Sequence, residues 1–325
     1  MSVGRNRLLV VTRVAAIDCG TNTVRLLIAD VLPGVGTTTE VVRTGTVTRL
    51  GQGVDRTGRL DPEALGRTLD ALREFAELIA AHDVQRTRFV ATSATRDAEN
   101  AGEFAGAVEE ILGIRPEVVT GAEEAELSFA GAVSVASGEH PGPYLVVDLG
   151  GGSTELVLGE REPVAAISLD VGSVRLHERH LHSDPPTQAE IDAAAADVRE
   201  ALDRAAGAVP LGETATLIGV AGTVTTLTAH AQRLPSYVRE RIDGAVLPTG
   251  IVLAAAQDVL HLTRAERGEL PYLQPGRVDV IGAGALVWFE VVSRVLAEVE
   301  AAGGELASVV TSEHDILDGI ALSLR

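Results

Sequence analysis

Two short stretches of the chain share one pattern of apolar, glycine and hydroxyl residues. In the later stretch, residues 146–158, an apolar segment ends in Asp148, three glycines follow, and a second apolar segment contains Glu155. This pattern predicts a strand, a tight turn and a returning strand, because glycine permits backbone angles that other residues avoid. The backbone N–H groups of such a turn are free to face an anion.

The earlier stretch repeats this order of residues. Residues 18–28 align with residues 148–158 without a gap, so that Asp18 falls on Asp148, and an apolar run precedes both. A matched pair of hairpins indicates two related halves that face each other. Two turns rich in backbone donors could then hold a chain of phosphates between them.

The rest of the chain alternates between strand and helix patterns. Further strands are expected at 38–42, 88–91, 117–119, 163–169, 215–220 and 305–310. Helices are expected at 61–81, 100–112, from 121 onward, after 171–176, and at 187–206, 249–261, 264–269, 279–299 and 315–324. We therefore expect an α/β fold, in which ligands bind at the carboxyl ends of strands.

The length of 325 residues suggests two domains. The strongest cluster of glycine and proline between the hairpins covers residues 137–143 and lies near the expected boundary. We assign residues 1–128 to an N-terminal domain and residues 129–325 to a C-terminal domain. Apolar residues make up 46% of the chain, so each half can bury a core.

The net charge of −19 limits the classes of molecule that the protein is expected to bind. A nucleic-acid partner is disfavoured, and an anionic substrate must be attracted by local arginines or by metal ions. No apolar run approaches the length of a membrane span, so no membrane partner is expected.

The types of basic and sulfur residues exclude several chemistries. The chain has no lysine, which excludes a Walker-type phosphate loop and Schiff-base catalysis. The single Cys19 excludes an intrachain disulfide and a cysteine-based metal cluster, and it fits a cytoplasmic location. Because no base is evident beside Cys19, we do not expect a catalytic thiol.

Three segments place polar residues next to predicted strands or helices. Residues 92–97 follow the strand that ends at Ala91 and combine hydroxyl groups with Arg96. Residues 219–227 place small residues between a strand and a helix, where a ligand can approach the helix N-terminus. Glu124 lies in the first turn of a helix, and by local position alone it would only complement the helix dipole.

Five stretches resemble the exopolyphosphatase/guanosine-pentaphosphate phosphatase family, a branch of the acetate kinase, sugar kinase, Hsp70 and actin superfamily. They are residues 17–26, 91–100 (ATSATRDAEN), 121–125, 148–156 (DLGGGSTEL) and 219–225. The stretches occur in the family's order, and the resemblance extends over essentially the whole chain. The resemblance implies two actin-like, ribonuclease H-like domains with an active site in the cleft between them. It also implies hydrolysis of a terminal phosphate with the help of Mg²⁺ or Mn²⁺.

The resemblance also implies roles for individual residues. Glu124 matches the catalytic glutamate, which would orient or deprotonate the attacking water. Asp148 and Glu155 match acids that assist the metal ion and the water. The expected phosphate-binding residues are Asn22, Thr23, Arg25, Arg96, Gly151, Gly152 and Ser153. These residue types suit phosphoryl transfer, which needs positioning and charge neutralisation more than a covalent nucleophile.

The chain departs from the family in two respects. Longer members carry additional C-terminal helical domains that help to grip long polymers, so shorter substrates are expected here. Residues 312–319 occupy the place of a Leu-Arg-Glu-Gly motif found in many members, which removes a cationic contact and leaves acids nearby. Binding of a polyanion would then depend on metal ions and on Arg25, Arg96 and Arg175.

Four functions remain open at this point. The first is release of orthophosphate from the end of inorganic polyphosphate, and the second is hydrolysis of pppGpp to ppGpp. The third is a weakly catalytic regulator that binds (p)ppGpp or polyphosphate, which the altered C-terminal stretch favours. The fourth, an ATP-dependent kinase or actin-like ATPase, is disfavoured because the stretches around Asp97 and Glu124 match the phosphatases. A homodimer is compatible with the resemblance, although no residue requires one.

Overall fold

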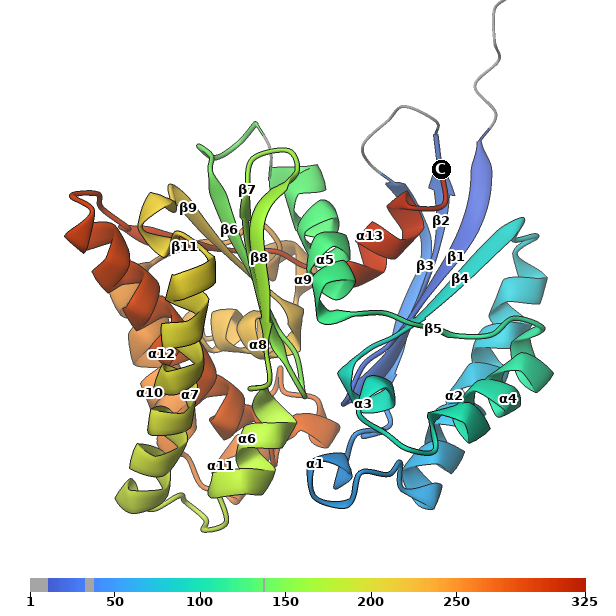
Figure 1. Cartoon of the computed structure of the whole chain (residues 1–325), viewed down its shortest axis with the longest axis horizontal. Helices are drawn as coiled ribbons and strands as arrows, with labels where there is room; N and C mark the ends of the chain where they lie inside the picture. The colour runs from blue at the N-terminus through green and yellow to red at the C-terminus, as the bar shows by residue number, and fades with distance from the viewer. Residues whose placement is uncertain (1–10, 33–37, 137) are drawn as a thin grey trace, which may run out of the picture.

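Each of the two predicted hairpins forms the centre of a mixed β-sheet (Figure 1). The computed structural model describes residues 11–32, 38–136 and 138–325. Ser137, the first residue of the predicted glycine- and proline-rich segment, lies outside these ranges. In Figure 1 the two sheets stand side by side, each with helices on its outer face. The expected α/β class is therefore confirmed.

The first sheet has the strand order β3-β2-β1-β4-β5. Its strands are β1 (Thr12–Cys19), β2 (Thr23–Val31), β3 (Thr38–Val47), β4 (Arg86–Ala91) and β5 (Glu117–Val118). The helices of this part of the chain are α1 (Val54–Thr57), α2 (Pro62–Ala81), α3 (Ser93–Arg96), α4 (Ala101–Leu112) and α5 (Gly121–Ala136). The central strand β1 is buried along most of its length, which explains its apolar sequence.

The second sheet has the strand order β10-β11-β9-β6-β7-β8. Its strands are β6 (Tyr144–Leu149), β7 (Thr154–Gly159), β8 (Pro163–Leu169), β9 (Thr216–Val220), β10 (Val246–Pro248) and β11 (Ser308–Thr311). Its helices are α6 (Ser173–His180), α7 (Gln188–Ala208), α8 (Ala221–Ala231), α9 (Arg239–Ile242), α10 (Thr249–His261), α11 (Arg264–Gly268) and α12 (Ile281–Ala301), and α13 (Ile316–Leu322) closes the chain. No helix in the described ranges has both the length and the apolar character needed to cross a membrane.

The two sheets repeat one arrangement of strands. The order β3-β2-β1-β4 in the first sheet corresponds to β8-β7-β6-β9 in the second, with the same antiparallel and parallel pairings. The register corresponds as well, because Asp18 pairs with Arg25 and Asp148 pairs with Glu155. A duplicated unit, as inferred from the aligned stretches, accounts for this correspondence.

Most predicted elements occur within a few residues of their expected positions. The largest difference is the strand expected at 38–42, which continues as β3 to Val47 because its second part pairs with the start of β2. The short elements α1, α3, α9 and β10 were not expected, because three or four residues give no periodicity that a sequence pattern can reveal.

Helices α5 and α13 lie between the two sheets (Figure 1). The expected boundary between residues 128 and 129 falls inside α5, where Leu127 joins the core under the first sheet and Phe129 joins the core under the second. The closing helix α13 packs against the first sheet, and its Ile320 shares a core cluster with Val14 of β1. The last helix therefore packs with the first half, while the division between residues 128 and 129 stays a prediction.

The two helices cross at very short distance through a pair of glycines. A Cβ at Gly131 of α5 would lie 1.9 Å from the carbonyl oxygen of Asp315. A Cβ at Gly319 of α13 would lie 1.9 Å from the carbonyl oxygen of Leu127. No side chain fits at these distances, so the crossing depends on glycine at both positions.

Replacing Gly131 with alanine is expected to lower the free energy of unfolding by about 1–3 kcal/mol, because the backbone of α13 must move away. Urea titration would measure the change. Gly106→Ala in α4 is the matched control, since no atom outside the neighbouring backbone of its own helix lies within 4 Å of the added Cβ. That variant should keep its stability or gain about 0.5–1 kcal/mol from helix propensity. Equal losses in the two variants would contradict a tight helix crossing.

Candidate active site between the two halves

The two glycine turns carry the same internal hydrogen bond. The Gly20 N–H donates to the Thr23 carbonyl oxygen at 3.0 Å, and the Gly150 N–H donates to the Ser153 carbonyl oxygen at 3.0 Å. The turns follow β1 and β6, which occupy corresponding places in the two sheets. They therefore match in geometry as well as in sequence.

The second turn meets the first half at Gly152. A Cβ at this position would lie 2.6 Å from the hydroxyl oxygens of both Thr21 and Ser93, which are hydrogen-bonded to each other at 2.8 Å. Glycine is required here because the two halves approach so closely. The two turns thus face each other, as the duplication predicted.

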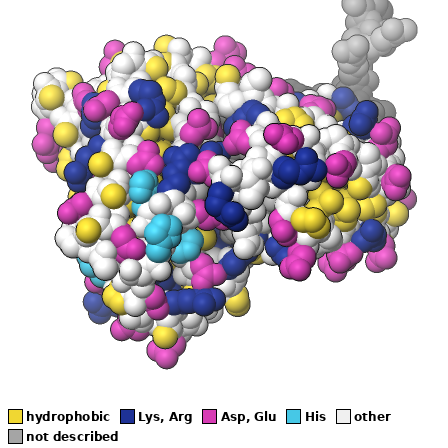
Figure 2. Space-filling view, turned by 60° about the horizontal axis from the view of Figure 1, so that its bottom comes forward, with side chains coloured by type: hydrophobic (Ala, Val, Ile, Leu, Met, Phe, Trp, Pro, Cys, Tyr) yellow, Lys and Arg dark blue, Asp and Glu magenta, His cyan; other side chains and the backbone are white. Residues whose placement is uncertain are grey.

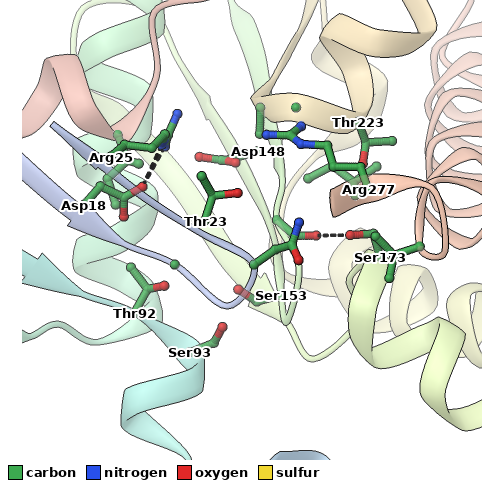
Figure 3. A pocket seen from close by; sticks show the side chains of 18 of the residues that line it. Asp18, Thr23, Arg25, Thr92, Ser93, Asp148, Ser153, Ser173, Thr223 and Arg277 are labelled. Atoms are coloured by element: carbon green, nitrogen blue, oxygen red, sulfur yellow. Dashed lines mark hydrogen bonds and ion pairs between the residues drawn. The ribbon is translucent and has the colours of Figure 1, made fainter. Parts of the chain in front are cut away.

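A cavity of about 90 Å³ lies between the turns (Figure 3). Asp18 and Asp148, the two aligned acids, both line it. In Figure 3, Arg25 and Arg277 lie on opposite sides of Asp148. The expected site residues that line this cavity are Asn22, Thr23, Arg25, Glu124, Asp148 and Ser153.

The other expected site residues lie beside this cavity and not in its wall. Gly151 and Gly152 pack against Thr21 of the first turn. Glu155 is 1% exposed and lies on β7, directly opposite Asp148. Its contact with the cavity is therefore indirect, and its role in binding a metal ion stays a prediction.

Arg96 reaches the cavity only through Glu124. Its Nη1 donates to the carbonyl oxygen of Val119 at 2.9 Å and to Oε2 of Glu124 at 3.2 Å. The residue belongs to the short helix α3, which directly follows β4. Arg96 thus fixes one oxygen of Glu124, and its expected contact with phosphate stays a prediction.

The cross-strand residue pairs at corresponding positions of the two hairpins differ in charge. In the first, Arg25 donates to the opposite Asp18 at 2.7 Å and also contacts Asp315. In the second, Asp148 stands opposite Glu155, and within the described residues neither acid forms an ion pair. Arg25 therefore neutralises Asp18, whereas Asp148 and Glu155 need a positive charge from outside the protein or a proton.

Three buried carboxyl groups lie close together in this region. Burial raises the pKa of Glu124, Asp148 and Glu155, and for Glu155 the nearby charges of the other two raise it further. Arg96 opposes the shift in the pKa of Glu124. Repulsion of this kind is relieved by protonation or by a bound cation.

A divalent cation fits this group when it is bound together with a phosphate. Among the described residues, no three His, Cys, Asp or Glu side chains are arranged to hold a metal ion. Asp148 and Glu124 line the cavity, and each is hydrogen-bonded through only one carboxylate oxygen. Mg²⁺ in phosphate-handling sites is commonly held by one or two carboxylates together with waters and substrate phosphates. The donors present suit that mode of binding.

The main residue that the sequence did not reveal is Arg277. It precedes α12, in the 3₁₀ turn Pro275–Arg277, and its guanidinium packs against Gly222 at the start of α8. Burial lowers its pKa, its Nε has no partner, and in the described part of the chain it forms no ion pair. A guanidinium in this position is available to bind an anion. The surrounding sequence contains no motif that would have indicated it.

Helix α8 presents its N-terminus to the same cavity. Ala221, Gly222 and Thr223 line the cavity, and the N-cap residue Val220 provides no side-chain cap. The first N–H groups of the helix therefore stay available for an anion. Ala221 has φ of 69°, a strained conformation for alanine that is typical of functional sites.

Arg175 joins the two halves and does not line the cavity. Its Nε donates to the carbonyl oxygen of Gly152 at 2.7 Å, and its guanidinium pairs with Asp55 and Asp97 of the first half. Figure 2 shows arginine and acidic side chains meeting where the halves adjoin. The residue is thus bound to protein carboxylates, and its expected role in binding a polyanion stays a prediction.

A second cavity of about 270 Å³ continues from the first. The two share Thr23, Arg25 and Arg277, so an extended anion could pass between these arginines. Arg43 and Arg239 also line the second cavity. Other residues of its wall are Thr225, Thr226, Tyr237, Tyr272, Gln274 and Glu313.

Two acids of the altered C-terminal stretch are neutralised by neighbouring side chains. Asp315 pairs with Arg25, while Asp318 pairs with Arg43 at 2.6 Å and with His314 at 2.9 Å. The pKa of His314 is raised to about 9, because the favourable contacts with its acids outweigh its burial. These acids therefore repel an anionic substrate less than the sequence suggested.

Comparison with known proteins places the chain among phosphatases. The model of the "Ppx/GppA phosphatase family" matches residues 27–322. Exopolyphosphatase 2 of Mycobacterium tuberculosis is 50% identical over an alignment of 320 residues, which covers 96% of this chain and 98% of that protein. The crystal structure of an exopolyphosphatase-like protein, 51% identical, superposes with a TM-score of 0.94 over 97% of this chain and 98% of that one.

A more distant structure supports the same conclusion. The Ppx/GppA family member of Aquifex aeolicus is 30% identical and superposes with a TM-score of 0.76, covering 97% of this chain and 98% of that chain. The two-domain actin-like fold implied by the resemblance is thereby confirmed. With a family match over most of its length and close relatives along nearly all of it, the chain belongs to the Ppx/GppA phosphatase family.

Proposed function

We propose that this chain is an exopolyphosphatase, which releases terminal orthophosphate from inorganic polyphosphate by attack of water. The position of Glu124 carries the proposal. This carboxylate of α5 lines the same cavity as the two glycine turns, Arg25 and Arg277. The relatives named as exopolyphosphatases support the same class of substrate.

The cavity suggests how each group would act on a terminal phosphate. The phosphate would lie between the turns and the start of α8, where backbone N–H groups can bind its oxygens. Arg25 and Arg277 would neutralise its charge from opposite sides. Glu124 would accept a proton from the attacking water as the bond from phosphorus to the bridging oxygen breaks. The departing oxygen leaves with the shortened chain, which is itself stabilised by the arginines.

A bound divalent cation would supply the positive charge that the second hairpin lacks. Asp148 is the best-placed ligand, because it lines the cavity and one of its oxygens accepts no hydrogen bond from the part of the chain that the structure describes. Glu124 lines the same cavity and Glu155 stands opposite Asp148 on β7, so two further carboxyl groups lie near that ligand. Water is the expected nucleophile, since burial raises the pKa of the Cys19 thiol and keeps it protonated.

The second cavity supports a preference for short chains. Phosphates that follow the terminal one would pass between Arg25 and Arg277 and contact Arg43 and Arg239. The wall of the second cavity also includes Tyr272, Gln274 and Glu313, none of which carries a positive charge. The positive lining therefore serves a limited number of phosphates.

A second candidate substrate is pppGpp, which would be hydrolysed to ppGpp. It is favoured by the aromatic side chains of Tyr237 and Tyr272 and by the polar groups of Gln274 and Glu313 in the second cavity. Such residues can stack on a nucleobase and accept its hydrogen bonds. The guanosine would then occupy the second cavity, while the 5′-phosphates extend into the first.

One assay separates the candidates. Phosphate release would be followed from polyphosphates of several lengths, pppGpp and ATP, with Mg²⁺, with Mn²⁺ and with excess EDTA. We expect the fastest release from short polyphosphates, and its loss in EDTA. Release from pppGpp alone would favour the second candidate, and tight binding of (p)ppGpp or polyphosphate without release would favour a weakly catalytic regulator. Turnover restricted to ATP would contradict both candidates.

A further inference from the structure

Ser128 forms a hydrogen bond that ties the catalytic helix to the second hairpin. Its hydroxyl donates to Oδ2 of Asp148 at 2.6 Å. The serine is fully buried, so water does not compete for this bond. Ser128 lies one turn after Glu124 on α5, and residues four apart occupy the same face of a helix. A single helix thus carries one acid of the cavity and holds a second.

The direction of this bond is unusual for a serine inside a helix. Such a hydroxyl commonly bonds back to a carbonyl oxygen three or four residues earlier in its own helix. Ser134, on the same helix, does this with the Gly131 carbonyl oxygen at 2.7 Å. Ser128 instead turns outward to a charged side chain of another element. A hydrogen bond to a carboxylate is stronger than one to a backbone carbonyl.

The bond fixes one end of a row of side chains on the second sheet. Asp148, Glu155 and Ser168 stand directly opposite one another on β6, β7 and β8. Ser168 donates to Oε1 of Glu155 at 2.7 Å, so each acid of the row receives one serine hydroxyl. On the first sheet the corresponding acid, Asp18, is held by Arg25 instead. Serine therefore orients Asp148 without neutralising it.

We propose that Ser128 is a positioning residue that holds Asp148 at a fixed place relative to Glu124. The inference rests on the proposed function, because it assumes that these two acids act together on phosphate and water. Asp148 lines the cavity, and among the described residues its other carboxylate oxygen accepts no hydrogen bond. Residues that orient a catalytic or metal-binding group commonly contribute a factor of ten to a hundred to its activity.

Three substitutions separate positioning from packing. Ser128→Ala removes the hydroxyl, Ser128→Cys keeps most of the volume with a much weaker donor, and Ser128→Thr keeps the hydroxyl. We expect kcat for the hydrolysed substrate to fall about tenfold to a hundredfold in the alanine and cysteine variants. The threonine variant should recover most of the rate. KM should change by less than about threefold in all three, because Ser128 does not line the cavity.

The control is Ser134→Ala, which removes a hydroxyl from the same helix without touching an acid of the site. It should leave kcat unchanged. Recovery of the rate by cysteine would mean that Ser128 only fills space, and an unchanged kcat in Ser128→Ala would overturn the proposal outright. Thermal unfolding of each variant would show that the measured protein is folded, and a rate loss that follows the loss of stability across the series would also overturn it.

The proposed function can fail separately from this inference. A normal kcat in Ser128→Ala together with a large loss of kcat in Glu124→Gln would refute the positioning role of Ser128 and leave the proposed function standing. If the unaltered chain releases phosphate from neither polyphosphate nor pppGpp, the proposed function fails and the inference falls with it. If both polyphosphate and pppGpp are hydrolysed, kcat of the Ser128 variants would be measured with the substrate that is hydrolysed faster.

Discussion

Glu124→Gln is expected to reduce kcat for phosphate release by about two to four powers of ten. Glutamine keeps the shape of the side chain and can still contact Arg96, but it cannot accept a proton from the attacking water. The side chain of Glu124 lines the cavity between the two turns, so loss of its carboxylate acts directly on the chemistry. Single-turnover measurements would separate this loss from changes in substrate binding.

Glu123→Gln provides the matched control for that variant. Glu123 neighbours Glu124 on α5 but forms an ion pair with Arg88 at 2.9 Å outside the cavity. Its replacement should leave kcat within about twofold, because an exposed ion pair contributes little. A normal rate in Glu124→Gln would remove the residue from the mechanism, even though the family membership would stand.

Arg25→Met is expected to lower the free energy of unfolding by about 3–5 kcal/mol near pH 7.5. The substitution leaves two buried carboxylates, Asp18 and Asp315, without the cation that they share. The pKa of Asp18 is raised by burial, and Arg25 opposes that shift, so its removal raises this pKa further. Above its raised pKa this acid is charged while it is buried, which destabilises the folded state. As the pH falls through that pKa, the acid becomes protonated and the destabilisation decreases. Urea titrations at pH 7.5 and pH 5 should therefore show a smaller loss at pH 5.

Arg277→Met provides the contrast, because Arg277 lines the same cavity but forms no ion pair within the described ranges. Its removal should leave the stability unchanged or increase it, since a buried guanidinium with an unpartnered Nε is lost. The value of kcat/KM should nevertheless fall about tenfold to a hundredfold, as expected for a hydrogen bond to a charged phosphate. Equal stability losses in the two variants would contradict the pairing described for Arg25.

The sequence was most informative where one pattern occurs twice. The repeated acid, glycine and hydroxyl residues predicted two matching hairpins, and the hydrogen bonds of Gly20 and Gly150 show the same turn in both halves. Their shared cavity contains Asp18 and Asp148, as expected from two halves that face each other. Long elements such as α2 and α10 were also predictable, because helical periodicity over many residues is a strong local signal.

Contacts between distant segments could not be predicted in this way. Arg277 is separated from the hairpins by more than a hundred residues, and only the folding of α8 and α12 brings it to the cavity. Ser128 gave no signal, because a serine in a helix has many possible partners. The ion pairs of Arg175 with Asp55 and Asp97 depend on how the two halves meet. The metal ion, the homodimer and the cytoplasmic location stay predictions, since each depends on something beyond the chain itself.

The return of α13 to the first sheet has a consequence during protein synthesis. Strands β1 and β2 are synthesised before the second sheet, but the side chains that cover one of their faces, among them Ile316, Leu317 and Ile320, are synthesised after it. Until then Val14 and Leu27 lack part of their apolar cover. The N-terminal half therefore completes its core only after the second sheet has been synthesised, in contrast to domains that fold one after another as they emerge.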